Sequence, residues 1–178
     1  MKLLNEKLAI NEYIYPFAEK NNSLLYSYIQ TLPRGENNTG VVKSLKLTPR
    51  NLHLDSNNEI QSLLKWINQL LDRDFIRRSH PMASYQHTPS VGLKCNEMWA
   101  LVCDKGDSID PHTHSPNAYT FTYYVNTPKG SSPIIFPISG HRIKAEAGKL
   151  VIFEGRLIHA VPPNKCEGRC IIGGCIGL

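Results

Sequence analysis

The sequence of 178 residues lacks the features of several large protein classes. None of its apolar runs approaches the ~18–20 residues of a membrane-spanning helix. The apolar positions near the N-terminus are interrupted by Asn, Glu and Lys, unlike the core of a signal peptide. The net charge of +5 is spread without a basic tail, so it favours solubility and does not indicate nucleic-acid binding. We therefore expect a soluble cytoplasmic protein that does not bind membranes.

The cysteines are not arranged for a metal site or for disulfides. The five cysteines are an odd number and form no CxxC pair, which excludes a zinc ribbon. Without a secretory signal we expect them to be reduced thiols. Cys166, Cys170 and Cys175 lie near the C-terminus, where small buried thiols of a last strand are the simplest interpretation.

The first half of the chain contains two helical patterns. Residues 18–32 place apolar side chains at helical spacing and end at Pro33. A clearer amphipathic pattern covers residues 57–73, with Ser56-Asn57-Asn58-Glu59 ahead of it as a match to a capping box. These patterns predict two helices.

The segments around the helices are less regular. Residues 3–15 have a strand-like distribution of apolar side chains, and residues 35–40 predict a polar loop. Residues 79–92 contain proline, serine and glycine and predict a long loop, either a lid over a site or a surface connector.

From Met98 onward the pattern changes to short apolar or β-branched runs separated by Gly and Pro turns. The expected strands are 98–103, 108–114, 119–126, 134–138, 142–145, 149–153, 157–161 and 169–176. This spacing is typical of an antiparallel sandwich or barrel. With no repeat and no linker, we expect one domain over residues 1–178. Residues 1–94 would buttress a β core of residues 95–178, giving an α+β, mainly β fold.

Four of the seven histidines lie between residues 112 and 159. His112 and His114 in one strand would project from the same face, about 6–7 Å apart along the strand. His159 lies in a later strand, and inward-facing residues of separate strands converge inside a small barrel. The three side chains could bind one metal ion and leave coordination positions open, as in a catalytic site.

Each histidine also has an ordinary explanation. A His-x-His pair near a turn is often on the surface, and a histidine among apolar residues, such as His159, is often a hydrogen-bonded core residue. His141 follows a Ser-Gly turn and is expected to be exposed. Asp110, two residues before His112, is a further ligand candidate on the same face.

A series of motifs runs through residues 95–178 in a fixed order: Trp99, Gly106-Asp107, Pro111-His112-Thr113-His114, Tyr123-Tyr124-Val125-Asn126, Gly148–Phe153, His159-Ala160-Val161 and Arg169. In this order they resemble the Fe(II)- and 2-oxoglutarate-dependent oxygenases, which have a double-stranded β-helix, a jelly-roll or cupin-like barrel. The sequence is most similar to a branch with a Pro-His-x-His motif that is frequent in bacteria and their phages. The resemblance covers about half of the chain and is thin before residue 95.

The resemblance implies a metal site beside a cosubstrate site. His112 and His159 would bind Fe(II), and His114 stands where the family usually has a carboxylate ligand. Arg169 would pair bidentately with the distal carboxylate of 2-oxoglutarate, and Tyr124 would direct its hydroxyl to the same group. The implied reaction hydroxylates an unidentified small molecule or protein side chain and releases succinate and CO₂.

Two departures from the family pattern leave other functions open. His114 is compatible with a three-histidine iron site that does not use 2-oxoglutarate, or with a water ligand in place of the carboxylate. Leu101 and Cys103 occupy positions where the family motif has Asn, so contacts made by those amides are lost. A barrel without catalysis, binding a ligand or a partner, is the third interpretation.

Overall fold

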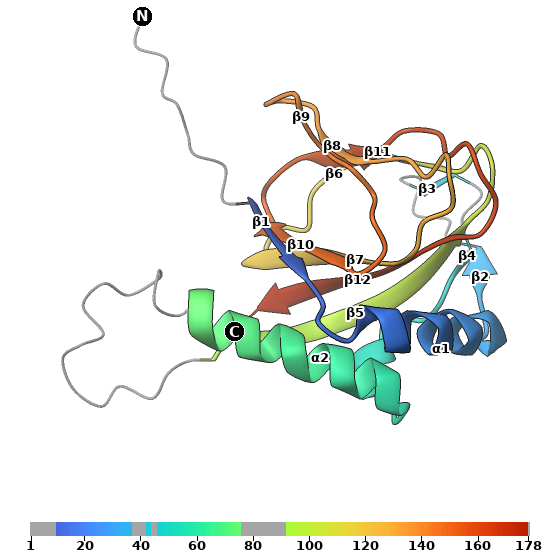
Figure 1. Ribbon diagram of the computed structural model, residues 1–178. Helices are drawn as coiled ribbons and strands as arrows, with labels where there is room; N and C mark the ends of the chain where they lie inside the picture. The colour runs from blue at the N-terminus through green and yellow to red at the C-terminus, as the bar shows by residue number, and fades with distance from the viewer. Residues whose placement is uncertain (1–9, 37–41, 44–45, 76–91, 178) are drawn as a thin grey trace, which may run out of the picture.

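The computed structural model describes residues 10–36, 42–43, 46–75 and 92–177. Two α-helices cover one face of a large antiparallel sheet, and a smaller antiparallel sheet lies over the opposite face (Figure 1). The expectation of a mainly β fold with antiparallel sheets and two helices is confirmed. No helix among the described residues is long and apolar enough to cross a membrane.

The helices form where the sequence carries the helical pattern. Helix α1 is Ala18–Thr31 and α2 is Asn58–Leu70; a 3-10 turn, Leu52–Leu54, precedes α2. Each helix buries one apolar stripe, made of Leu25 and Ile29 in α1 and of Ile60, Leu63, Ile67 and Leu70 in α2. Helix α2 ends before the expected residue 73 because the chain continues as a π-helical turn, Leu71–Phe75, which buries its first and last side chains.

The start of α2 is capped one residue later than the capping box predicts. The N-cap is Asn57, whose side chain accepts hydrogen bonds from the backbone N–H groups of Glu59 and Ile60, at 3.0 and 3.1 Å. Asparagine satisfies two otherwise unpaired donors of the first turn in this way. The prediction of a cap in this segment is confirmed, but Ser56 is not the capping residue.

The two sheets share no strand and differ in strand length. The large sheet has the order β1 (Ile10–Ile14), β10 (Lys149–Glu154), β7 (Tyr119–Asn126), β12 (Arg169–Gly177), β5 (Lys94–Cys103), β4 (Lys46–Leu47) and β2 (Gly35–Glu36). The smaller sheet has the order β3 (Val42–Lys43), β6 (Ser108–His112), β11 (His159–Val161), β8 (Ile134–Phe136) and β9 (His141–Ile143). The N-terminal half therefore supplies edge strands to both sheets as well as the two helices.

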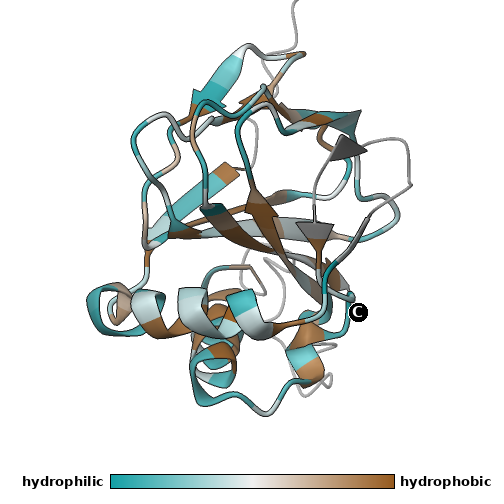
Figure 2. Ribbon diagram, turned by 90° about the vertical axis from the view of Figure 1, so that its right-hand side faces the viewer, coloured by the Kyte–Doolittle hydropathy of each residue, from teal (hydrophilic) through white to brown (hydrophobic). Residues whose placement is uncertain are grey.

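The large sheet separates two hydrophobic clusters. One cluster lies between this sheet and the helices, and the other joins residues of both sheets. Figure 2 shows the hydrophobic segments of the large sheet between the helices and the smaller sheet. The expected alternation of Tyr123 and Tyr124 is confirmed, because Tyr123 belongs to the helix-side cluster and Tyr124 to the cluster between the sheets.

All the strands expected after Met98 are present, although several are shorter than predicted. The polar loop predicted at 35–40 is wrong at its start, where β2 forms, since a two-residue strand has too few positions for a visible alternation. Strand β6 ends at His112, so the prediction that His114 belongs to this strand is also wrong. The loop predicted at 79–92 lies, except for Gly92, outside the described residues.

Candidate metal centre

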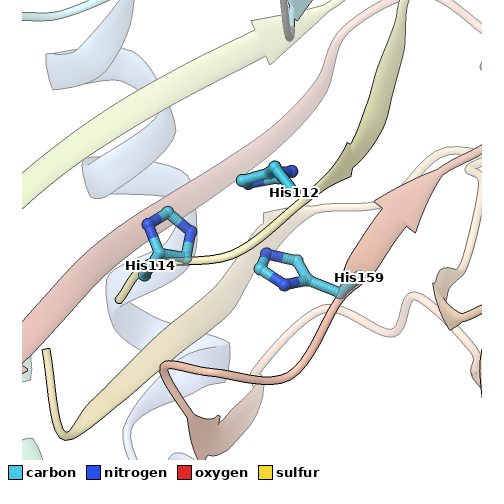
Figure 3. Close-up of side chains that lie close together, drawn as sticks. All are labelled: His112, His114 and His159. Carbon is cyan, nitrogen blue, oxygen red and sulfur yellow. The ribbon is translucent and has the colours of Figure 1, made fainter. Parts of the chain in front are cut away.

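Three histidines meet at the side of the smaller sheet that faces the large one. His112 ends β6 and His159 begins β11, and antiparallel pairing puts these two residues directly opposite each other. The ring centroids of His112 and His159 are 4.3 Å apart, and that of His114 is 5.0 and 5.1 Å from them. One ring nitrogen of each residue lies within 4.8 Å of the other two. Figure 3 shows the three rings facing a common point.

His114 reaches this point from a turn and not from a strand. Its backbone N–H donates to the carbonyl of Gly155 at 2.7 Å, and its own carbonyl accepts from the backbone and side-chain amides of Asn117, at 2.9 and 3.0 Å. These bonds fix the turn after β6 and direct His114 back toward His112. The same-face argument predicted the right neighbours from an incorrect local structure.

Two of the histidines have ring protons fixed by backbone carbonyls. His112 Nδ1 lies 2.9 Å from the carbonyl oxygen of Asp110, and His159 Nδ1 lies 2.9 Å from that of Leu157. A carbonyl can only accept, so each Nδ1 carries the proton and each Nε2 keeps a free lone pair. Hydrogen bonds of this kind orient metal-binding histidines and select the nitrogen that binds.

Burial keeps these imidazoles uncharged at neutral pH. It lowers the pKa of His114 to about 3, with a further contribution from repulsion by the neighbouring histidines. The pKa of His159 falls to about 4 from burial and from the proximity of His112. Burial also lowers the pKa of His112, although its hydrogen bond to the Asp110 carbonyl opposes the shift. Neutral imidazole is the form that binds metals.

The remaining histidine and carboxylate candidates do not join this group. His141 is exposed at the start of β9, as expected. Asp110 contributes its backbone carbonyl to His112, and its carboxylate is not among the groups that could hold the ion. Among the described residues, the potential ligand set is therefore three histidines without a carboxylate.

The histidines line a cavity of about 330 Å³ between the two sheets. Arg169 and Tyr124, predicted from the family resemblance, line the same cavity. Its other walls include Arg50, Glu97, Trp99, Leu101, Ile109, Thr120, Ile171, Gly173 and Cys175. This volume lies at the lower end of the range for small-molecule sites, and apolar walls with a few converging polar groups are typical of them.

Arg169 and Tyr124 form a buried polar pair with unused hydrogen-bonding groups. Arg169 is 1% exposed, and its Nη1 donates to the thiol sulfur of Cys103 at 3.3 Å. Its Cζ lies 5.6 Å from the centroid of the Tyr124 ring. Neither Arg169 Nε nor the Tyr124 hydroxyl has a hydrogen-bond partner among the described residues. An unpaired buried polar group costs about 1–3 kcal/mol, so these atoms indicate a place for a polar ligand.

The charges around this pair favour an anion. Arg169 takes part in none of the ion pairs found among the described residues. Burial raises the pKa of Tyr124, although the charge of Arg169 opposes the shift, so the phenol keeps its proton and can donate it. A fixed cation beside a neutral donor suits a carboxylate better than any neutral group.

Sequence reasoning missed two contacts at this cavity. Arg50 lies with its Cζ 4.6 Å from the centroid of the Trp99 ring and donates to Glu97 at 2.8 Å, and no motif marked it. Cys175 Sγ lies 3.6 Å from His114 Nδ1, although the sequence suggested only a core thiol. The alternation of β12 could have revealed Cys175, because every second residue from Arg169 lines the cavity.

Comparisons with known proteins give a consistent fold assignment. No protein-family model and no curated protein matches the sequence. A prolyl-4-hydroxylase from Pseudomonas putida superposes with a TM-score of 0.69 at 13% identity, covering 97% of this chain and 94% of that one. The viral collagen prolyl hydroxylase from Paramecium bursaria Chlorella virus-1, in its 2-oxoglutarate complex, gives 0.67 at 13% identity over 95% and 96%.

A third solved structure is HygX from Streptomyces hygroscopicus with nickel and 2-oxoglutarate bound. It gives a TM-score of 0.64 at 12% identity, over 96% of this chain and 83% of that one. The structural neighbours are 2-oxoglutarate- and Fe(II)-dependent oxygenases, the group that the sequence motifs resemble. At this identity the likeness shows that the fold is shared, and the site has to be judged from its own residues.

Proposed function

We propose that this protein is an Fe(II)- and 2-oxoglutarate-dependent dioxygenase with a double-stranded β-helix core, which hydroxylates an unidentified substrate. One observation carries the proposal: a three-histidine group and a buried arginine–tyrosine pair with unused donors line the same cavity. The fold shared with 2-oxoglutarate oxygenases supports it. The histidine group alone would indicate only metal binding, and the arginine–tyrosine pair alone would indicate only anion binding.

The histidine group fits the metal. His112, His114 and His159 would hold Fe(II) through imidazole nitrogens, which suit iron, and three protein ligands leave positions for cosubstrate and oxygen. Because no carboxylate belongs to the group, the protein adds no negative charge to the ion. The incoming 2-oxoglutarate would provide the anionic oxygens of the completed site.

The arginine–tyrosine pair fits the cosubstrate. Arg169 and Tyr124 would bind the distal carboxylate of 2-oxoglutarate and hold its other end toward the histidines. When bound, the metal and 2-oxoglutarate would supply the oxidation: one oxygen atom of O₂ enters the substrate and the other enters succinate, with loss of CO₂. The residues of the chain would orient the cosubstrate and keep water from the cavity.

A three-histidine iron protein that does not use 2-oxoglutarate is the second candidate, favoured by the ligand set without a carboxylate. The two candidates differ at Arg169. A cosubstrate role predicts that Arg169→Ala keeps the iron and loses binding and turnover of 2-oxoglutarate. If the second candidate is right, 2-oxoglutarate has no effect on the rate of oxidation, and Arg169→Ala does not change that.

The decisive experiment is an anaerobic titration with Fe(II), then with 2-oxoglutarate. We expect one iron per chain, followed by the weak visible charge-transfer band of the chelate, and succinate formation when O₂ is admitted. The variant His159→Ala should lose both signals, and Arg169→Ala should lose only the second. Iron binding without the band or succinate would exclude our first proposal, and absence of iron would leave a ligand-binding protein without catalysis.

A further inference from the structure

We propose that Cys103 is a positioning residue for the cosubstrate: its thiol sulfur holds the guanidinium of Arg169 in place and thereby selects the length of the 2-oxo dicarboxylate that fits. This inference rests on the proposed function, because Arg169 would bind the distal carboxylate. It begins from the hydrogen bond that Arg169 Nη1 donates to Cys103 Sγ at 3.3 Å. Cys103 does not line the cavity found among the described residues, so it would act only through Arg169.

Cys103 and Arg169 are fixed neighbours in the large sheet. Cys103 is the last residue of β5 and Arg169 is the first of β12, and antiparallel pairing puts them directly opposite each other. They are 3% and 1% exposed, so water does not compete for the contact. A guanidinium has donors and no acceptor, so the sulfur accepts. The direction of this hydrogen bond is therefore fixed by the chemistry of its two groups.

The end of β5 is itself held by the turn that follows it. The backbone N–H of Asp104 donates to Asp107 Oδ2 at 2.7 Å. The backbone N–H of Asn164 donates to the carbonyl of Asp107, and the carbonyl of Asn164 accepts from the backbone N–H of Gly106, both at 2.8 Å. These bonds tie the turn to a distant segment of the chain. The sulfur that receives the guanidinium therefore lies on a well-anchored backbone.

A thiol can hold the guanidinium without cancelling its charge. Burial raises the pKa of Cys103, although the charge of Arg169 opposes the shift, so the sulfur keeps its proton and is uncharged at neutral pH. A carboxylate in this place would form an ion pair with Arg169 and compete with the carboxylate of a ligand. The bond to Cys103 uses Nη1, whereas Nε has no partner among the described residues. The arginine is therefore oriented while its charge and its Nε donor are left for a ligand.

A guanidinium held in one place favours one length of ligand. With one end of a 2-oxo acid at the histidine group and the other at Arg169, the carbon chain has to span the distance between them. Oxaloacetate is one carbon shorter than 2-oxoglutarate, and 2-oxoadipate is one carbon longer. If Arg169 were released from Cys103, its guanidinium could move to meet the shorter and the longer acid. Cys103 would therefore contribute to the difference between the affinities for these acids, which is the measure of specificity.

The first test needs neither metal nor cosubstrate. Rotation about the Nε–Cζ bond of Arg169, measured by side-chain NMR in the metal-free protein, reports whether the guanidinium is held. We expect slow rotation in the unchanged protein and in Cys103→Ser, whose hydroxyl oxygen also accepts, and faster rotation in Cys103→Ala and Cys103→Val. Valine fills the space of the thiol without accepting a hydrogen bond, so the comparison of Ser with Val does not depend on the cavity left by Ala.

Cys170→Ala is the matched control for the loss of a buried thiol. Cys170 is the next residue of β12 after Arg169, is fully buried, and belongs to the helix-side cluster on the other face of the sheet. This variant should leave the rotation of the Arg169 guanidinium unchanged.

The second test compares the affinities of the Co(II)-loaded protein for 2-oxoglutarate, oxaloacetate and 2-oxoadipate by anaerobic titration. Cys103→Ala and Cys103→Val should bind 2-oxoglutarate about fivefold more weakly, which is the size of one ordinary hydrogen bond, and their preference for it over the other two acids should narrow. Cys103→Ser should keep most of the affinity and of the preference. A purely structural role would instead lower thermal stability and weaken the binding of all three acids alike.

The outcomes separate this inference from the proposed function. Equal rotation rates of the Arg169 guanidinium in the unchanged protein and in the Ala and Val variants would overturn the role of Cys103, as would an unchanged preference among the three acids. Failure of the unchanged, metal-loaded protein to bind any of the acids would overturn the proposed function. The NMR result on metal-free protein would still decide whether Cys103 holds Arg169.

Discussion

The polar groups at the two ends of the cavity differ in whether they have hydrogen-bond partners. At the histidine end, each ring has a partner for its Nδ1, either a backbone carbonyl or the Cys175 thiol. At the other end, Arg169 Nε and the Tyr124 hydroxyl are buried without a partner among the described residues. The histidine rings are therefore oriented before any ligand binds, whereas the hydrogen bonds of Arg169 and Tyr124 are completed only by a bound ligand. A site whose ends differ in this way is suited to a metal that stays and a cosubstrate that is replaced at each turnover.

The largest effect is expected when one of the candidate metal ligands is removed from the histidine end of the cavity. His159→Ala should lower the affinity for Fe(II) or Co(II) by more than about 100-fold, because losing a ligand exceeds the 10–100-fold cost of losing an outer partner. Isothermal titration under anaerobic conditions measures the loss. His141→Ala, at an exposed histidine of β9, should bind metal normally. Equal affinity in the two variants would contradict the assignment of the metal site.

The next largest effect concerns the unpaired cation. Arg169→Met should weaken 2-oxoglutarate binding by about 2–5 kcal/mol, the usual cost of truncating one partner of a buried charged pair. Without ligand, the same variant should gain about 1 kcal/mol in free energy of unfolding, because a buried guanidinium with an unused donor is replaced by an apolar chain. Urea denaturation with and without 2-oxoglutarate tests both the weaker ligand binding and the gain in free energy of unfolding. A variant that is less stable than the parent without ligand would show that Arg169 has a structural role.

A smaller effect is expected at the two adjacent tyrosines of β7, which can be compared directly with each other. Tyr124→Phe removes the unpaired hydroxyl in the cavity and should weaken 2-oxoglutarate binding by about 1 kcal/mol, roughly fivefold, with no loss of stability. Tyr123→Phe removes a hydroxyl bonded to Asn22 on the helix side, and should lower stability by about 1 kcal/mol while leaving the affinity unchanged. Ligand titration and thermal unfolding of both variants form the test, and the reverse pattern would refute it.

The smallest effect is expected at the Arg50–Glu97 ion pair of the cavity wall. Both side chains are about half exposed, so water screens the pair. Arg50→Gln should change the free energy of unfolding by less than about 1 kcal/mol, as for most surface pairs. Chemical denaturation at low and high salt checks this value. A larger change would mean that the stacking on Trp99 contributes more than the ion pair.

Much of this architecture could be predicted from local patterns. Glycine and proline turns marked every strand after Met98, and period-two alternation placed Tyr123 and Tyr124 on opposite faces. The motif order brought His112, His114, His159, Arg169 and Tyr124 together as candidates, and all of them line one cavity. Their roles as ligands of iron and 2-oxoglutarate are still our proposal.

The missed features depend on contacts between distant segments. Strands β2, β3 and β4 have two residues each, so only pairing with longer strands reveals them. The position of His114 depends on a hydrogen bond to Gly155, which lies far along the chain. The contact between Cys175 and His114 joins β12 to the turn after β6, and no local pattern specifies how these two segments lie together.

The direct pairing of His112 with His159 has a consequence for the smaller sheet as a whole. Its strands β8, β9 and β11 have only three residues each, so few hydrogen bonds hold them together. An ion bound by both histidines would cross-link β6 and β11, and its binding free energy would stabilise the folded sheet because the unfolded chain has no preformed site. The stability of the smaller sheet would then depend on bound metal. Amide hydrogen exchange in β8 and β9 should be slower when the ion is bound.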